Sequence, residues 1–172
     1  MRNRKLGFTL IELLVVIAVL GTLAVVVLLA LNPLQQLART RDSGRISATT
    51  QLGHAMEAYA TSHNGTYVAE GATWITTLVN AGEIQTVPAA IAYSVTGTSA
   101  CTANAQNGVC YDATTAAGGA PVVIYATLES DSNNSFCTGA EIAYSVYSTA
   151  DGRGGIVCSA SAPTPGSQTF EN

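Results

Sequence analysis

The chain opens with a long apolar segment. Between Phe8 and Leu31 the only charged residue is Glu12. A helix over this segment would be roughly 36 Å long, and a membrane's hydrocarbon core is about 30 Å thick. The pattern therefore predicts a transmembrane helix over residues 8–31.

A second periodic pattern follows the apolar segment. Apolar residues recur there at three- and four-residue spacing, which is typical of an amphipathic helix. They are Leu34, Leu37, Ala38, Leu52, Ala55, Met56, Tyr59 and Ala60. The spacing predicts an amphipathic continuation of the helix over residues 32–63. Pro33 predicts a kink or break at its start, and Gly65 can take the left-handed conformation that ends helices.

Beyond His63 the pattern predicts a globular domain over residues 64–172. A short helix is expected around 73–80, and alternating apolar and polar residues then indicate β-strands. The strand candidates are 91–95, 121–128, 142–149 and 154–160, and residues 161–172 are expected to be irregular. The pentapeptide IAYSV occurs in two of these strand candidates. The expected fold is α+β, with a long N-terminal helix, partly transmembrane, packed on a small antiparallel sheet.

The basic residues are unevenly distributed. Arg2, Arg4 and Lys5 precede the apolar segment, which predicts a cytoplasmic N-terminus and an outward-facing C-terminal domain. Only 10% of the residues are charged, and the net charge is −4. An acidic domain of this kind makes specific binding to nucleic acid unexpected.

Four cysteines lie in the predicted outward-facing domain: Cys101, Cys110, Cys137 and Cys158. An even number in an oxidising compartment favours two disulfides over reduced thiols. Three pairings are possible, and the sequential pairing is favoured because both loops are short and lie between strand candidates. Metal binding is disfavoured, because no two of these cysteines have the C-x-x-C spacing.

Candidate residues for catalysis are few. His54 and His63 lie on or near the amphipathic helix without a recognisable nucleophile or carboxylate arrangement, so a surface or packing role is favoured. Asp131, Asn133, Asn134 and Asp151 carry oxygens suited to calcium, but their spacing fits turns better than a known loop. We therefore expect no enzyme activity, no metal and no cofactor.

Four tyrosines allow two interpretations. Tyr93, Tyr111, Tyr144 and Tyr147 either form an exposed patch for a ligand or lie half-buried in the sheet. The second interpretation, half-buried sheet residues, is favoured.

Glu12 requires a specific explanation, because a charge at bilayer depth costs at least ~2.5–3.5 kcal/mol. A secretory signal peptide has a shorter apolar core and a small-residue cleavage site, and a plain membrane anchor leaves the glutamate unexplained. A cut between Gly7 and Phe8 would create an amine four residues before Glu12. Residues four apart lie on one helix face, so amine and carboxylate can pair within a chain or between staggered chains.

The segment KLGFTLIELLVVIAVLG, residues 5–21, resembles the N-terminus of type IV prepilins and of the pseudopilins of type II secretion. The shared pattern is a basic leader ending in glycine, then Phe-Thr-Leu-Ile-Glu and an apolar run. The resemblance implies a leader of residues 1–7 that prepilin peptidase removes after Gly7, an N-methylated Phe8, and a Glu12 that engages a neighbour's amine.

The resemblance also implies a setting. The chain would span the inner membrane once and would then enter a cell-surface pilus or a periplasmic pseudopilus. Its partners would be prepilin peptidase, copies of itself and other pilins, and the assembly platform with its ATPase. One departure concerns the helix, because many pilins carry a proline where this chain has Leu29, and the proline here is Pro33.

The leading hypothesis is a subunit of a type IV pilus-like filament for adhesion, motility or DNA uptake. The expected disulfides and the large domain favour a pilin over the first alternative, a type II secretion pseudopilin. The second alternative is a membrane-anchored binding domain outside the cytoplasm.

Overall fold

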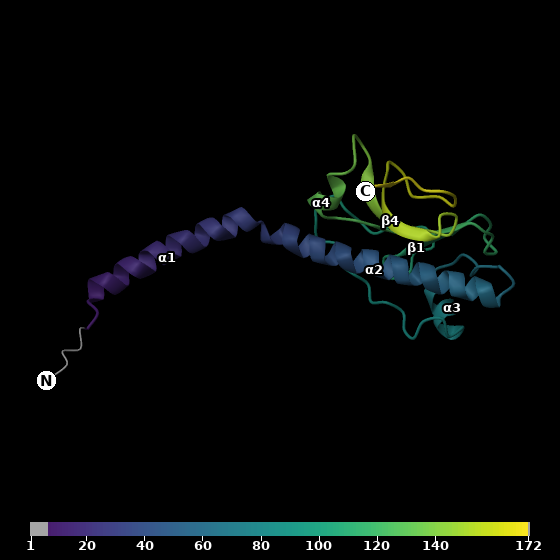
Figure 1. Ribbon diagram of the computed structural model, residues 1–172, viewed down its shortest axis with the longest axis horizontal. Coiled ribbons are helices and arrows are strands. Elements are labelled where there is room, and N and C mark those ends of the chain that lie inside the picture. Colours follow the sequence, from purple (N-terminus) through teal and green to yellow (C-terminus); the bar gives the residue numbers. More distant parts are fainter. Residues whose placement is uncertain (1–6, 172) are drawn as a thin grey trace. The chain divides into compact units, whose positions relative to one another are not determined.

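The computed structural model describes residues 7–171 and divides the chain into two units, Met1–Gln36 and Leu37–Asn172. The basic leader residues Arg2, Arg4 and Lys5 lie outside the described residues. The first unit contains helix α1, Leu10–Leu31, and the start of helix α2, Pro33–Ser62 (Figure 1). The second unit holds the rest of α2 and the helices and strands that follow it.

The ends of the two long helices have local causes. Thr9 is the N-cap of α1, so the helix begins at Leu10, two residues after the predicted start. α1 ends at Leu31 because Asn32 adopts a left-handed conformation with φ of 39°. Pro33 then opens α2, which matches the break predicted at this proline. α2 ends at Ser62, and the left-handed Gly65 donates its N–H to the carbonyl of Ala60 over 2.8 Å.

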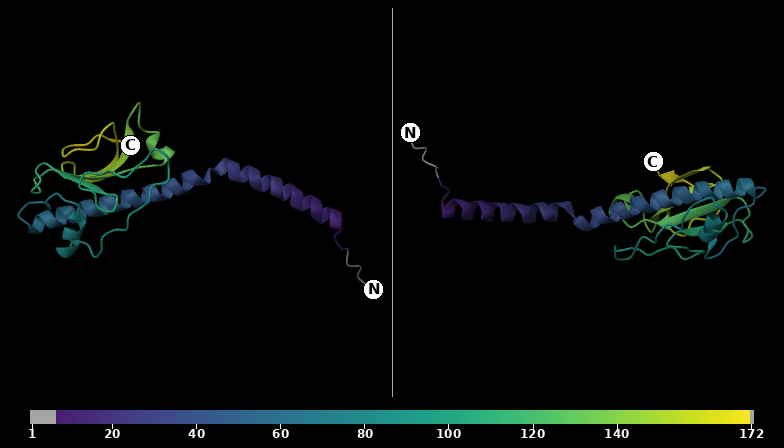
Figure 2. Two further views of the ribbon diagram at one scale, coloured as in Figure 1. Left: turned by 180° about the vertical axis from the view of Figure 1, so that it is seen from behind. Right: turned by 90° about the horizontal axis from the view of Figure 1, so that it is seen from below.

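The second unit contains a five-stranded antiparallel sheet in the order β1-β2-β3-β4-β5. Both views of Figure 2 show the sheet alongside the part of α2 that belongs to this unit. In the central register Tyr125 pairs with Val146, and Val146 pairs with Gly155. The two further helices are short. The bounds are α3 Trp74–Asn80, β1 Cys110–Ala113, β2 Val122–Thr127, α4 Asp131–Asn134, β3 Ile142–Ser148, β4 Arg153–Ser159 and β5 Phe170–Glu171. A long N-terminal helix with an antiparallel sheet is the predicted α+β, pilin-like arrangement, which is confirmed.

Both faces of the sheet are covered. On one face α2 and α3 supply Leu52, Met56, Trp74 and Leu78 to a core that also contains Ile124 of the sheet. The opposite face forms a smaller core, which the loop before β1 and the C-terminal segment help to cover. Its members include Cys110, Val123, Tyr125, Tyr144, Val146, Val157 and the partly buried Phe170. The interior strand β2 is therefore buried on both sides.

Three of the four predicted strands are present, as β2, β3 and β4. The strand predicted over 91–95 is wrong, because its backbone polar groups bond to side chains instead of to a neighbouring strand. The carbonyls of Ile91 and Ala92 accept from Arg45, and the N–H groups of Ser94 and Val95 donate to Glu129. The short strands β1 and β5 and the short helix α4 were not predicted.

One glycine allows α2 to approach the sheet closely. A Cβ built at Gly53 would lie 2.2–2.5 Å from ring atoms of Tyr147 in β3, which is far inside van der Waals contact. Tyr147 is itself 1% exposed and has no room to move. A Cβ at Gly44, by contrast, would meet only the terminal Cδ1 of Ile91, at 2.9 Å. The glycine that weakens the helix at position 53 is therefore required by packing.

We predict that Gly53→Ala lowers the free energy of unfolding by about 1–3 kcal/mol, although alanine favours the helix by about 1 kcal/mol. The overpacked Tyr147 ring is the reason. Gly44→Ala is the matched control and should change stability by less than about 1 kcal/mol, because the Ile91 side chain can rotate away. Denaturant unfolding of the detergent-solubilised chain, followed by circular dichroism, measures both, and equal effects would contradict the packing argument.

Candidate functional site

The start of α1 is built around a reciprocal contact between Thr9 and Glu12. The Thr9 hydroxyl accepts from the backbone N–H of Glu12 over 3.3 Å. Glu12 Oε2 in turn accepts from the Thr9 N–H over 2.9 Å and from the Thr9 hydroxyl over 2.7 Å. This is a capping box, which satisfies helix N–H groups that otherwise have no partner.

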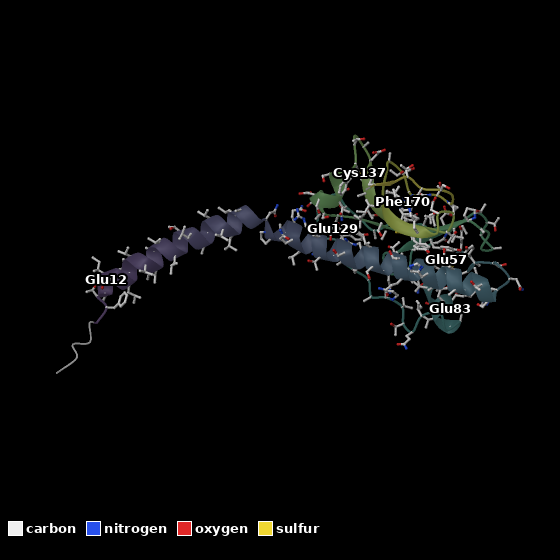
Figure 3. All side chains as sticks on the ribbon, in the orientation of Figure 1. Glu12, Glu57, Glu83, Glu129, Cys137 and Phe170 are labelled. Carbon is white, nitrogen blue, oxygen red and sulfur yellow. A yellow bond between two sulfur atoms is a disulfide. The ribbon has the colours of Figure 1, made fainter. Side chains whose placement is uncertain are left out.

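The second carboxylate oxygen of Glu12, Oε1, can accept a further hydrogen bond. Within residues 7–171 no group donates a hydrogen bond to Glu12 Oε1. The Glu12 side chain is exposed near the beginning of α1 (Figure 3). The carboxylate can therefore accept a further donor without breaking its contact with Thr9.

The rest of α1 presents apolar side chains on all sides. The large apolar residues from Phe8 to Leu29 are 47–83% exposed. The hydroxyl of Thr22, a polar group inside the run, donates back to the Val19 carbonyl over 2.9 Å. Among the described residues, Leu10–Ala30 is the one helix long and apolar enough to cross a membrane. Its apolar surface and internally bonded polar groups suit a membrane interior.

Gly7 and Phe8 lie just before this helix and are exposed. A Cβ at Gly7 would meet nothing within 4 Å, and its φ is not left-handed, so the fold itself does not require glycine there. Phe8 is 83% exposed and borders the same surface hollow as Ile11, Glu12 and Val15. The residue predicted to become the N-terminus and the predicted assembly carboxylate therefore lie on one side of the segment.

A second polar cluster lies inside the globular unit and centres on Asp42 of α2, which is 1% exposed. Its carboxylate accepts from the backbone N–H groups of Glu129 and Ser130 at 2.8–3.2 Å, and from the Asn133 amide at 2.8 Å. It also pairs with Arg45, at 2.7 Å between Nη1 and Oδ1. Asp42 thus binds α2 to the segment that follows β2.

Glu129 completes this cluster. Its side chain is fully buried and pairs with Arg41 and with Arg45, the latter at 3.2 Å. Glu129 lies beside α2 (Figure 3). Burial alone would raise the pKa of Glu129. Hydrogen bonds from Arg41 and from the Ser94 and Val95 N–H groups, together with the charge of Arg45, outweigh burial and lower the pKa to about 2.

The four cysteines form two disulfides, Cys101–Cys110 and Cys137–Cys158, which is the sequential pairing. The first ties the loop before β1 to the sheet, because Cys110 begins that strand. The second joins the segment after α4 to β4. Both lie in the globular unit, away in sequence from Gly7, Phe8 and Glu12.

The other candidate residues take structural positions. His63 stacks on Tyr59 with 3.7 Å between ring centroids, and His54 lies 3.3 Å from the Tyr147 hydroxyl. Within residues 7–171 no three His, Cys, Asp or Glu side chains gather as metal ligands would. The Asn133 and Asn134 amides donate to protein oxygens.

The tyrosines do not form an exposed patch. Tyr111, Tyr144 and Tyr147 are 0–6% exposed, and Tyr93 is half-buried with its hydroxyl donating to the Thr127 carbonyl over 2.9 Å. The interpretation as sheet and packing residues is therefore the better one.

Two parts of this arrangement were missed in the sequence, although both left a signal there. The T-x-x-E spacing of Thr9 and Glu12 is a capping-box signature. Asp42 and Arg45 continue the helical spacing of the buried positions from Ala38 to Thr49, so charged residues stand on the core-facing side of α2. In a chain with few charges, that placement indicates a buried ion cluster.

Residues 2–28 match the family model described as the prokaryotic N-terminal methylation motif. This motif is the signature of type IV prepilins and pseudopilins, and the chain carries it over the segment that contains Gly7, Phe8, Thr9 and Glu12. The chain thus has the N-terminal segment of a type IV pilin or pseudopilin precursor. Comparisons with curated proteins and with solved structures gave no match.

We predict that Glu129→Gln lowers the free energy of unfolding by about 3–5 kcal/mol at neutral pH, because it leaves buried arginine charge uncompensated. A pKa lowered from 4.5 to about 2 gives stability that is present above pH 4.5 and lost as the pH falls towards 2. The variant should therefore lose less stability than the native chain over that interval.

Denaturant unfolding at a series of pH values measures this difference. Glu83→Gln is the matched control, because Glu83 lies outside the cluster and, within residues 7–171, its carboxylate accepts only a long 3.4 Å bond from Ser62. It should keep the native pH dependence and change stability by less than about 0.5 kcal/mol. If the free energy of unfolding of Glu129→Gln changes with pH as it does in the native chain, the Glu129 carboxylate is not the cause of the loss of stability in acid.

Proposed function

We propose that the chain is a structural subunit of a type IV pilus-like filament. Prepilin peptidase would cut after Gly7, Phe8 would be N-methylated, and the subunit would assemble through its N-terminal helix. The observation that carries the proposal is the methylation motif on a helix whose apolar surface is exposed throughout. Such a helix is stable in a membrane or packed against like helices, and assembly would exchange one environment for the other.

The geometry around Glu12 supports its proposed role in assembly. One carboxylate oxygen is held by Thr9 within the chain, and the other accepts nothing from residues 7–171. The amine created at Phe8 would supply a charged donor for this oxygen, either in the same chain or in a neighbour. A buried pair of this kind offsets the cost of carrying each charge into an apolar filament core.

The position of glycine supports processing at Gly7. A side chain at position 7 would meet open space, so packing within the chain's own fold does not explain the glycine. A protease that fits the backbone closely into its active site would favour glycine at this position. The exposed Gly7–Phe8 bond is accessible to it.

The domain favours a pilus over a type II secretion pseudopilus. Two disulfides and a five-stranded sheet make a larger and more cross-linked domain than major pseudopilins typically carry. Disulfides restrict the unfolded chain, which suits a protein that works under load outside the cell. The work of the filament would be adhesion, motility or DNA uptake.

We predict that the mature protein begins at an N-methylated phenylalanine, Phe8. Intact-mass and N-terminal peptide analysis of membrane and filament fractions would detect the loss of residues 1–7 and the added methyl group. Expression in cells that lack prepilin peptidase should leave the chain at its full length, with residues 1–7 still attached. A mature protein that still starts at Met1 in the presence of the peptidase contradicts the proposed function.

We predict that Glu12→Ala abolishes filaments and leaves membrane insertion and Gly7 processing intact. Glu12→Gln is the matched control for the helix cap, because glutamine still accepts from Thr9 but carries no charge. Both variants should fail to assemble if the charge is what the neighbour recognises. Electron microscopy and immunoblotting of filaments sheared from the cell surface measure the yield. A normal filament yield in Glu12→Gln would contradict the charge-pairing role.

A further inference from the structure

Strand β1 stands at one end of the sheet order, so one of its edges has no neighbouring strand. Side chains close this free edge instead. The Tyr111 carbonyl accepts from the Asn104 amide over 3.1 Å, and the Ala113 N–H donates to Glu70 Oε1 over 2.8 Å. Because unpaired edge groups are a template for pairing with another chain, these two contacts protect the edge.

The segment that carries Glu70 is docked on β1 and on the turn that follows it. The Glu70 N–H donates to the Ala116 carbonyl over 2.9 Å. The Tyr111 hydroxyl donates to the Val68 carbonyl over 2.7 Å. Segment 67–70 is therefore held at the free edge of β1 by backbone groups as well as by the Glu70 side chain.

A second carboxyl group, that of Asp112 in β1, lies at the same place. Asp112 directly precedes Ala113, so Glu70 Oε1 lies within about 5 Å of the Asp112 Cα. The Asp112 carboxyl group hydrogen-bonds to the Glu70 carboxyl group and to the Ala113 N–H. Two carboxyl groups can bond to each other only when one of them carries a proton. The contact therefore requires a shared proton.

The groups around this pair do not neutralise it. Those that act on Asp112 within residues 7–171 include no arginine or histidine. The phenols of Tyr67, Tyr111 and Tyr125 are also close by. Burial, and after it nearby carboxylates, raise the pKa of Tyr111 and Tyr125, so both phenols stay neutral. Burial, and after it the Glu70 carboxyl group, raise the pKa of Asp112 above its usual 3.8.

We propose that Glu70 and Asp112 form an acid-tightened clasp on the free edge of β1. In acid the protonated Asp112 donates to the Glu70 carboxylate, which keeps its bond to the Ala113 N–H. As the pH rises, Asp112 releases its proton to water and the two carboxylates repel each other. Segment 67–70 is then held less tightly, and the edge of β1 opens more often. The clasp acts in the single chain and does not depend on filament formation.

The direction of the pH effect follows from the raised pKa of Asp112. The stabilisation that the clasp adds is fully present below pH 3.8, the value of the free side chain. It is lost as the pH rises through the higher pKa of the folded chain. This is the reverse of the Glu129 cluster, whose stabilisation is lost in acid.

The test is amide hydrogen exchange of the Ala113 N–H, followed by NMR on the full chain in a zwitterionic detergent. The protection factor corrects for the pH dependence of free amides. It should fall about threefold or more between about pH 4 and about pH 7, the lower end of the coupling found between residues in contact. The control amide is that of Thr77 in α3, which donates to the Thr73 carbonyl over 3.0 Å and should keep a constant protection factor.

Two variants locate the effect. In Asp112→Asn the new amide can donate to Glu70 at every pH, and in Glu70→Gln the new amide can donate to the Asp112 carboxylate. Each variant should hold the Ala113 protection factor constant over the pH range. Glu171→Gln is the matched control, because Glu171 is exposed on β5 at the opposite end of the sheet, and it should keep the native fall.

Circular dichroism checks that the variants fold, and either variant tests the clasp if the other does not fold. The proposal is overturned if the Ala113 protection factor of the native chain is constant or rises with pH. It is also overturned if a folded Asp112→Asn or Glu70→Gln variant keeps the native fall.

Discussion

The globular unit depends on a buried ion cluster made of Arg41, Asp42 and Arg45 from α2 and Glu129 from the segment after β2. Only 10% of the chain is charged, yet this cluster places several charges inside the fold. The cost of burying them is offset because each carboxylate also accepts from backbone N–H groups. The cluster fixes which part of the sheet lies on the first half of α2, where the helix has few apolar side chains to make that contact.

Helix α1 shows the opposite arrangement, with apolar side chains on the outside instead of charges on the inside. It buries almost nothing within the described chain, but the polar side chains of Thr9, Glu12 and Thr22 are bonded locally. Within residues 7–171 the second oxygen of the Glu12 carboxylate is the exception, since only Oε2 accepts from Thr9. The same rule, that polar groups must be paired wherever water is absent, therefore governs the inside of the globular unit and the outside of α1.

Much of the fold could be predicted because the relevant signals are local. The apolar run, the break at Pro33, the stop at Gly65 and the strands over β2 to β4 depend on residues close together in sequence. Gly7, Phe8 and Glu12 were likewise predicted from one short segment, and the family comparison matches that segment. The buried ion cluster could not be predicted in the same way. The residues that meet around Asp42 lie up to 91 positions apart and come together only after the chain folds.

The repeated pentapeptide IAYSV adopts two different structures, so its local sequence alone does not determine its conformation. At 142–146 it lies in strand β3, with β2 and β4 hydrogen-bonded on either side. At 91–95 it is irregular, because Arg45 and Glu129 bind the backbone groups that a strand would need. By itself the sequence determined the membrane-length helix, the segment that matches the methylation motif and the α+β class, since apolar periodicity and helix caps act over a few residues. Only the tertiary structure decided which IAYSV became a strand and which charges were buried, because both depend on side chains that are distant in sequence and bind the same backbone groups.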